Sequence, residues 1–119
     1  MVKIYLRSII KDRKNRLALF DSNRNGDIND LTTEVKAGDT IIWKLDCCSG
    51  IKSITRIYSK EEEHPVFKSE PVKRFLCKGF KLKLEKGAAG KEKYTIECIL
   101  SNNKELIIDP YIRVPPPDI

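Results

Sequence analysis

No segment of the printed sequence has the pattern of a membrane-spanning helix or of a signal peptide. No apolar run approaches the roughly 20 residues that a membrane-spanning helix needs. Residues 1–7 contain neither a long apolar core nor a small-residue cleavage site of the kind that a signal peptide carries. We therefore expect a cytoplasmic protein with no membrane partner, whose four cysteines are thiols.

Residues that commonly carry catalysis or bind metals are also scarce. The chain has one histidine, His64, and one methionine, Met1, and its four cysteines form no Cys-x-x-Cys pair. No Ser/His/Asp or Cys/His set has a supporting spacing, and the Gly87–Gly90 stretch leads into a strand pattern rather than a phosphate-binding helix. His64 follows three glutamates, and we expect it to be solvated. These observations argue against an enzyme.

Alternation of apolar and polar residues is abundant and recurs along the whole chain. Such runs begin at Val2, Ile41, Phe80, Tyr94 and Ile112, and Gly, Asn, Asp and Ser separate many of them. Short strands at this spacing predict an all-β, antiparallel Greek-key β-sandwich of about seven or eight strands. Residues 1–119 are expected to form a single domain, with residues 115–119 as a Pro-rich tail. Residues 59–71 show no alternation and predict a long exposed connection, with at most one helical turn.

The net charge of +6 is unevenly distributed. Residues 1–20 carry a net +5 and residues 73–93 a net +6, whereas residues 21–72 carry −3 and residues 94–119 carry −2. A basic face could attract nucleic acid or an anionic surface. Alternation places Phe80 and Tyr94 inside, however, and nucleic-acid binding usually requires exposed aromatic rings. A solvated strand face is the simpler interpretation.

Two segments carry a family resemblance. In residues 35–43, Gly38 permits a tight turn, Asp39 can accept hydrogen bonds from nearby N–H groups, and Trp43 provides a large buried anchor. Together with the Tyr-x-x-x-Cys pattern of residues 94–98, this segment resembles the signature strands of cupredoxins. The resemblance implies a cupredoxin-like sandwich, and the chain is also similar to small bacterial proteins of that shape whose last strand carries Asp-Pro-x-Ile.

The resemblance does not extend to the copper ligands. Blue-copper sites use two imidazoles, a thiolate and usually a thioether. Here one histidine lies in the wrong segment and no ligand follows Cys98. Cys47 and Cys48 stand in the place of the first copper histidine, so we do not expect a blue-copper site. If the likeness holds, Cys47 or Cys48 could approach Cys98 as a thiol site or a labile disulfide. The simpler interpretation is that these cysteines are small core residues.

The sharpest local motif is an Asp- and Asn-rich loop that resembles the start of a calcium loop. Oxygen ligands stand at loop positions one, three and five, and a glycine at position six allows a sharp bend. Position twelve is Thr32 rather than glutamate, and an ordinary polar hairpin loop fits as well. The candidate calcium ligands are Asp21, Asn23, Asn25, Asp27 and Asp30.

The sequence thus predicts a non-enzymatic binding or structural protein of cupredoxin-like shape, without a blue-copper site and without a cofactor other than calcium. Its partner would be another protein or a second copy of itself. The alternatives are a calcium-binding module that uses residues 21–30, and a basic-face binder of nucleic acid or anionic surfaces that uses residues 73–93.

Overall fold

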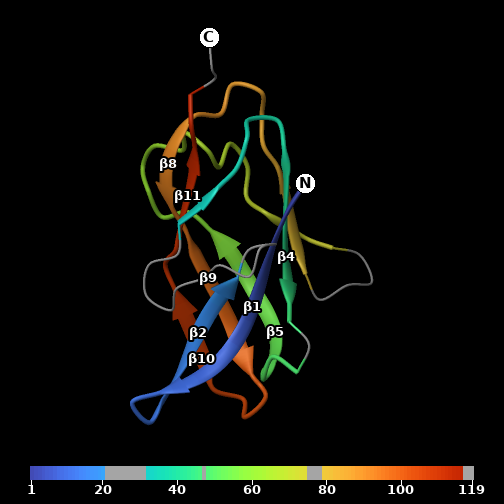
Figure 1. The fold of residues 1–119 in the computed structure, drawn as a ribbon, viewed down its shortest axis with the longest axis vertical. Helices are drawn as coiled ribbons and strands as arrows, with labels where there is room; N and C mark the ends of the chain where they lie inside the picture. The colour runs from blue at the N-terminus through green and yellow to red at the C-terminus, as the bar shows by residue number, and fades with distance from the viewer. Residues whose placement is uncertain (21–31, 47, 75–78, 117–119) are drawn as a thin grey trace.

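The computed structural model describes residues 1–20, 32–46, 48–74 and 79–116. Within these ranges the protein is all-β and contains no helix, and hence none that could span a membrane. Figure 1 shows the strands, which form three sheets. They are β1 (Val2–Lys11), β2 (Lys14–Phe20), β3 (Thr32–Glu34), β4 (Thr40–Leu45), β5 (Ile51–Tyr58), β6 (Val72–Lys73), β7 (Phe80–Lys83), β8 (Gly90–Lys93), β9 (Thr95–Leu100), β10 (Glu105–Ile108) and β11 (Tyr111–Val114).

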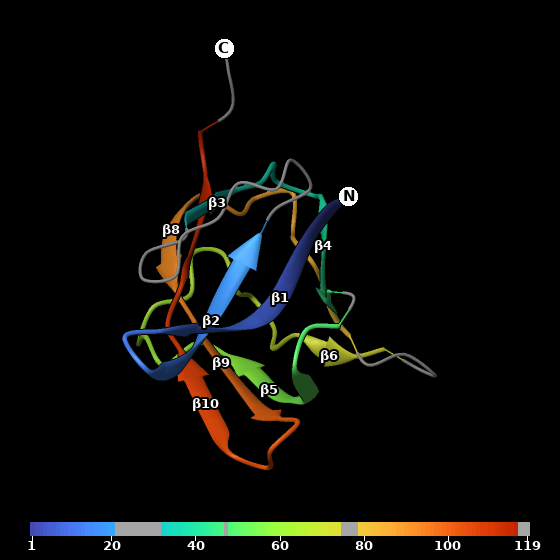
Figure 2. The same ribbon diagram turned by 60° about the horizontal axis from the view of Figure 1, so that its bottom comes forward.

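The five-stranded sheet has the order β2-β1-β4-β7-β6, and the two smaller sheets have the orders β10-β9-β5 and β3-β11-β8. Figure 2, turned to bring the lower end forward, also shows the short edge strand β6. β1 pairs with β4 and β3 with β11 in parallel, so the expectation of a purely antiparallel arrangement is wrong. Alternation reveals which face of a strand is buried but not the direction of its neighbour, and both parallel pairs join strands distant in sequence.

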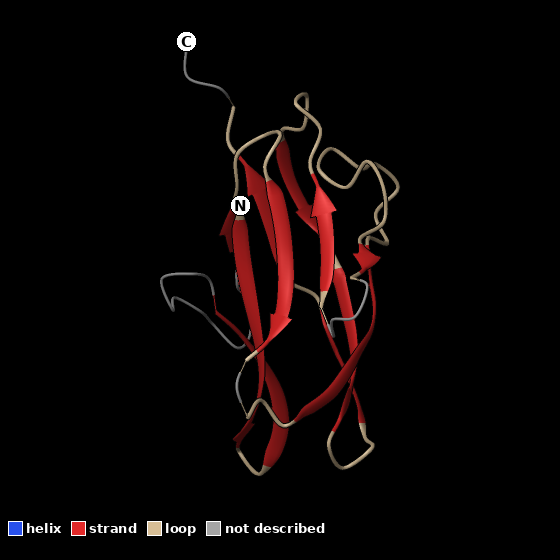
Figure 3. Cartoon of the chain, turned by 90° about the vertical axis from the view of Figure 1, so that its right-hand side faces the viewer, coloured by secondary structure: helices blue, strands red, loops and turns tan. Residues whose placement is uncertain are grey.

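The described residues form more strands than the predicted seven or eight, in part because two long runs are interrupted. Only Tyr94 separates β8 from β9, and Asp109 and Pro110 separate β10 from β11. Proline has no N–H group to contribute to a ladder. The two interruptions lie beside each other, since the Tyr94 N–H donates to the Pro110 carbonyl at 3.0 Å. Viewed from the side, the strands form two layers (Figure 3).

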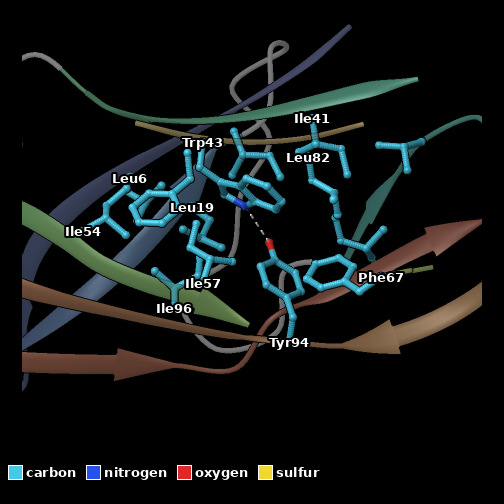
Figure 4. Packing of buried hydrophobic residues seen from close by; sticks show 14 of the residues in the cluster. Leu6, Leu19, Ile41, Trp43, Ile54, Ile57, Phe67, Leu82, Tyr94 and Ile96 are labelled. Carbon is cyan, nitrogen blue, oxygen red and sulfur yellow. Dashed lines mark hydrogen bonds between the residues drawn. The ribbon is translucent and has the colours of Figure 1, made fainter. Parts of the chain in front are cut away.

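The core lies between the five-stranded sheet and the two smaller sheets. Trp43 from β4 is fully buried and donates its indole Nε1–H to the Tyr94 hydroxyl at 3.1 Å (Figure 4). Their ring centroids are 5.7 Å apart in an edge-to-face arrangement, and Phe67 lies 5.1 Å from Tyr94. The two segments that suggested a cupredoxin-like shape therefore touch in the centre of the core. The predicted burial of Phe80 and Cys98 is also confirmed.

The turn before β4 has the local geometry that its residues predict. Gly38 has a φ of +80°, a conformation that side chains with a Cβ rarely adopt. The Asp39 carboxylate Oδ1 accepts the Thr40 N–H at 2.8 Å. The turn thereby directs β4 between β1 and β7, with Trp43 facing inward.

The connection between β5 and β6 differs from its prediction. It contains no helical turn, as the prediction allowed, but Val66 and Phe67 are buried in the core, with 0 % and 4 % of their surface exposed. An apolar pair among charged and small residues has no periodicity, and so its burial could not be inferred from pattern alone. The connection is thus anchored in the core by Val66 and Phe67 and is not a fully exposed loop.

Candidate functional site

The five-stranded sheet concentrates positive charge. Its strands contain nine basic residues and no acidic residue. By contrast, the six strands of the two smaller sheets contain five basic and four acidic residues. The nine are Lys3, Arg7, Lys11, Lys14, Arg16, Lys44, Lys73, Lys81 and Lys83. The two basic segments of the sequence therefore meet in one sheet, because β1 and β7 lie on either side of β4.

Five of these residues, Lys3, Arg7, Lys44, Lys81 and Lys83, form what we call the basic face. They alternate with the buried residues of β1, β4 and β7 and so share the outer side of the sheet. Ile42 pairs with both Lys3 and Lys81, which places these two lysines in one row across three strands.

The spacing along this row follows from sheet geometry. Two interstrand spacings separate Lys3 from Lys81, so their Cα atoms lie about 10 Å apart. This is comparable to the Debye length of about 8 Å at physiological salt, so the like charges repel only weakly. The same spacing allows one extended polyanion to contact several of them.

Carboxylates border the basic face at the two ends of β4. Asp46 follows the strand, and its N–H donates to the Leu6 carbonyl at 2.9 Å. Asp39 precedes it, and its Oδ1 lies 2.6 Å from the amino group of Met1. The hydrogen bond from that amino group, helped by the Thr40 N–H and opposed by burial, lowers the pKa of Asp39. The Asp39 charge is therefore already paired and does not neutralise the lysines.

A second cluster centres on Glu92, whose side chain is fully buried. Its Oε1 accepts the N–H groups of Val66 and Phe67, both at 3.0 Å, and its Oε2 lies 3.0 Å from His64 Nδ1. Burial by itself would raise the pKa of Glu92. The hydrogen bonds from Phe67, Ser59, His64 and Val66 together outweigh burial and lower the pKa. The carboxylate is therefore ionised at neutral pH and fastens the β5–β6 connection to β8.

The expectation that His64 is merely solvated is corrected by this cluster. Its side chain is 43 % exposed, yet Glu92 holds one ring nitrogen. Glu61 acts similarly, since its carboxylate accepts the Lys93 N–H at 3.0 Å. Sequence reasoning missed Glu92, although the signal was present: it lies two residues before Tyr94 and therefore shares its inward-facing parity.

The predicted thiol site is described only in part. Cys98 is buried and its Sγ lies 3.7 Å from the Leu106 carbonyl. Burial raises the pKa of Cys98 to about 12, so its thiol stays protonated and is a poor nucleophile or metal ligand. Cys48 is exposed in the β4–β5 connection, and Cys47 lies outside the described residues. A thiol site shared by these cysteines stays a prediction.

The predicted calcium ligands Asp21, Asn23, Asn25, Asp27 and Asp30 lie outside the described residues, and so calcium binding also stays a prediction. Among the residues that are described, no group of three or more His, Cys, Asp and Glu side chains is placed to hold a metal ion. Among the described features, the basic face consequently gives the best support for a ligand-binding site.

Comparison with known proteins does not identify a family for this chain. A scan against protein-family models finds no match, and a search of the curated proteins finds no relative.

Proposed function

We propose that this chain is a non-enzymatic binding protein that holds single-stranded nucleic acid on its basic face. One observation carries the proposal: five neighbouring strands contain nine basic residues and no acidic one. Positive charge that tracks a phosphate backbone supplies most of the affinity in non-specific binding. Segment 73–93 contributes only Lys81 and Lys83 to the basic face, and the other three basic residues come from β1 and β4.

Two further observations favour nucleic acid over a lipid surface. Tyr5 and Phe20 are paired in register next to the basic face, and both rings are half-buried, so they could support base stacking. Proteins that bind membranes through charge usually also insert an apolar helix face or a lipid chain. Within the described strands of this sheet, the exposed large apolar residues are Ile10 and Val72, at the hairpin end of β1 and in the edge strand β6.

We further propose that the two layers form a Greek-key sandwich of cupredoxin-like shape that has no copper site. The contact between Trp43 and Tyr94 supports this proposal, because it joins the two segments that carry the resemblance. The sandwich would serve as a scaffold that keeps the five-stranded sheet flat enough to present its basic outer face.

The test measures binding of a fluorescein-labelled oligothymidylate of 20 nucleotides by anisotropy at increasing salt. We expect binding at low salt that weakens steeply as salt rises, by about 0.7 in log-log slope for each phosphate neutralised. Lys81→Glu/Lys83→Glu should weaken binding at least tenfold. The matched control is Lys52→Glu/Lys104→Glu, which changes the net charge equally on the smaller sheet and its hairpin, and should weaken binding by less than threefold.

Absence of binding at low salt would overturn the proposal. Equal losses in the two double variants would also overturn it, because total charge rather than the basic face would then explain binding. A third arm uses vesicles containing phosphatidylserine. Binding to these vesicles without binding to the oligonucleotide would replace nucleic acid by an anionic membrane as the ligand.

A further inference from the structure

Two edge strands lie beside each other without pairing. β2 ends the five-stranded sheet and β10 ends the β10-β9-β5 sheet. Cα atoms of the two strands approach within 8 Å, yet no ladder joins them in the described structure. Figure 1 shows β2 next to β10 in the lower part of the molecule. Two surface hollows lie along this seam and share Asn15 and Leu106, and together we call them the groove.

β10 carries hydrogen-bonding groups on its edge, on the side away from β9. The Leu100 N–H donates to the Lys104 carbonyl at 2.8 Å, which makes this pair a hydrogen-bonded one in the β9–β10 hairpin. Bonded pairs alternate along an antiparallel ladder, so Leu106 is the next bonded position. Glu105 and Ile107 therefore direct their N–H and C=O groups away from β9. An edge with this geometry can accept another strand.

The walls of the groove are mainly positive. Five basic residues line it, against the two acidic residues Glu105 and Asp109, and Asp109 already accepts the Thr95 hydroxyl at 2.6 Å. The five are Arg13, Lys14, Arg16, Lys93 and Lys104. A segment that lies in the groove would accordingly be complementary if it were acidic.

Arg16 adds an independent indication of a ligand. Its Nε atom is buried and has no hydrogen-bond partner, although the side chain lines the groove. A buried donor on a charged group is costly to leave unsatisfied, and such atoms are rare in native proteins. A carboxylate in the groove could accept this hydrogen bond once the Arg16 side chain turned to expose Nε.

We propose that the edge of β10, on the side where it lies near β2, binds an extended acidic peptide segment of a partner protein, which adds to β10 as a further strand. Side chains of an added strand alternate between its two faces. Acidic residues at every second position would face the basic residues of β2. The residues between them would be apolar and would lie beside Ile107, whose surface is 55 % exposed. This mode of recognition takes affinity from the main chain and specificity from alternate side chains.

The first test uses a labelled octapeptide of alternating glutamate and valine and measures its binding to the full chain by anisotropy. We expect N-methylation of alternate peptide amides to weaken binding at least tenfold, because it removes strand hydrogen bonds and keeps the charge. Replacing glutamate by lysine should abolish binding. Absence of binding at millimolar peptide, or equal binding of the N-methylated peptide, would overturn strand addition.

Variants of the protein locate the site. Arg16→Gln should weaken peptide binding at least fivefold, whereas Lys52→Gln on β5, away from the groove, should change it less than twofold. Lys81→Glu/Lys83→Glu removes charge from the basic face and should leave peptide binding within twofold. Loss of binding in that double variant would place the peptide on the basic face and overturn the inference. The outcome is independent of nucleic-acid binding, so either proposal can fail alone.

Sedimentation of the protein alone completes the test. If β10 instead pairs with β10 of a second copy, the protein will dimerise with increasing concentration and the peptide will not compete. That outcome would overturn the inference of an acidic partner segment.

Discussion

The strands of the five-stranded sheet contain basic residues and no acidic one, whereas the β3-β11-β8 sheet contains both signs. In the smaller sheet, Arg113 forms an ion pair with Glu34, and Glu92 points inward to hold the β5–β6 connection. Lysines of the large sheet alternate with core residues and gather on one surface. Charge therefore serves stability in one region, and in the other it provides a surface for a ligand. Substitutions should separate these roles.

The largest expected effect is at Glu92. Glu92→Ala leaves the N–H groups of Val66 and Phe67 and the ring of His64 without their acceptor. Removing one member of a buried charged network typically costs about 3–5 kcal/mol, and we expect a loss of this size in urea unfolding. Glu63→Ala, on the exposed part of the same connection, should change the free energy of unfolding by less than about 0.5 kcal/mol. Similar losses at both positions would show that the buried Glu92 contributes no more to stability than an exposed glutamate of the same connection.

The hydrogen bonds to Glu92 should also make the stability of the protein depend on pH. The pKa of Glu92 is lower in the folded protein than in the unfolded chain, so the unfolded state binds the proton more readily. The stabilisation is therefore complete above the unfolded carboxyl pKa, near 4.5, and disappears as pH falls through the folded value. Unfolding measured between pH 7 and pH 3 should show a steeper acid decline for the natural protein than for Glu92→Gln. Parallel curves would contradict this assignment.

An intermediate effect is expected where the two layers meet. Tyr94→Phe removes the acceptor of the Trp43 indole and leaves a buried N–H unsatisfied. The loss should be about 1–3 kcal/mol in thermal or urea unfolding. Tyr111→Phe is the control, because this ring is only half-buried, is not one of the core residues and lies 4.5 Å from the Lys91 ammonium. A negligible effect of Tyr94→Phe would show that the hydrogen bond does not connect the layers.

The smallest effect on stability is expected on the basic face. Lys81→Glu/Lys83→Glu replaces two exposed charges that stabilise no described partner and relieves repulsion among the lysines. The free energy of unfolding should stay within about 0.5 kcal/mol of the natural value, or rise slightly at low salt. Nucleic-acid binding should fall sharply in the same variant. A large loss of stability would show that these lysines have a structural role.

The sequence was most informative where alternation was regular. It predicted the inward faces of the segments that contain Trp43, Phe80 and Tyr94, and the turn at Gly38. It was least informative for Val66 and Phe67, which have no periodic neighbours, and for Glu92, whose charge argued for the surface despite its parity. The sequence also showed two basic segments but not that they would lie on one sheet.

The amino-acid sequence by itself determined an all-β protein, and it determined which face of each regular strand is buried and which is exposed to solvent. A side-chain period of two is a local property, and each segment carries it without reference to the rest of the chain. Only the tertiary structure decided which strands became neighbours, since strand pairing depends on contacts between distant segments. That choice placed β4 between β1 and β7 and thereby created the basic face. It also brought Glu92 beneath the β5–β6 connection and left the edges of β2 and β10 side by side.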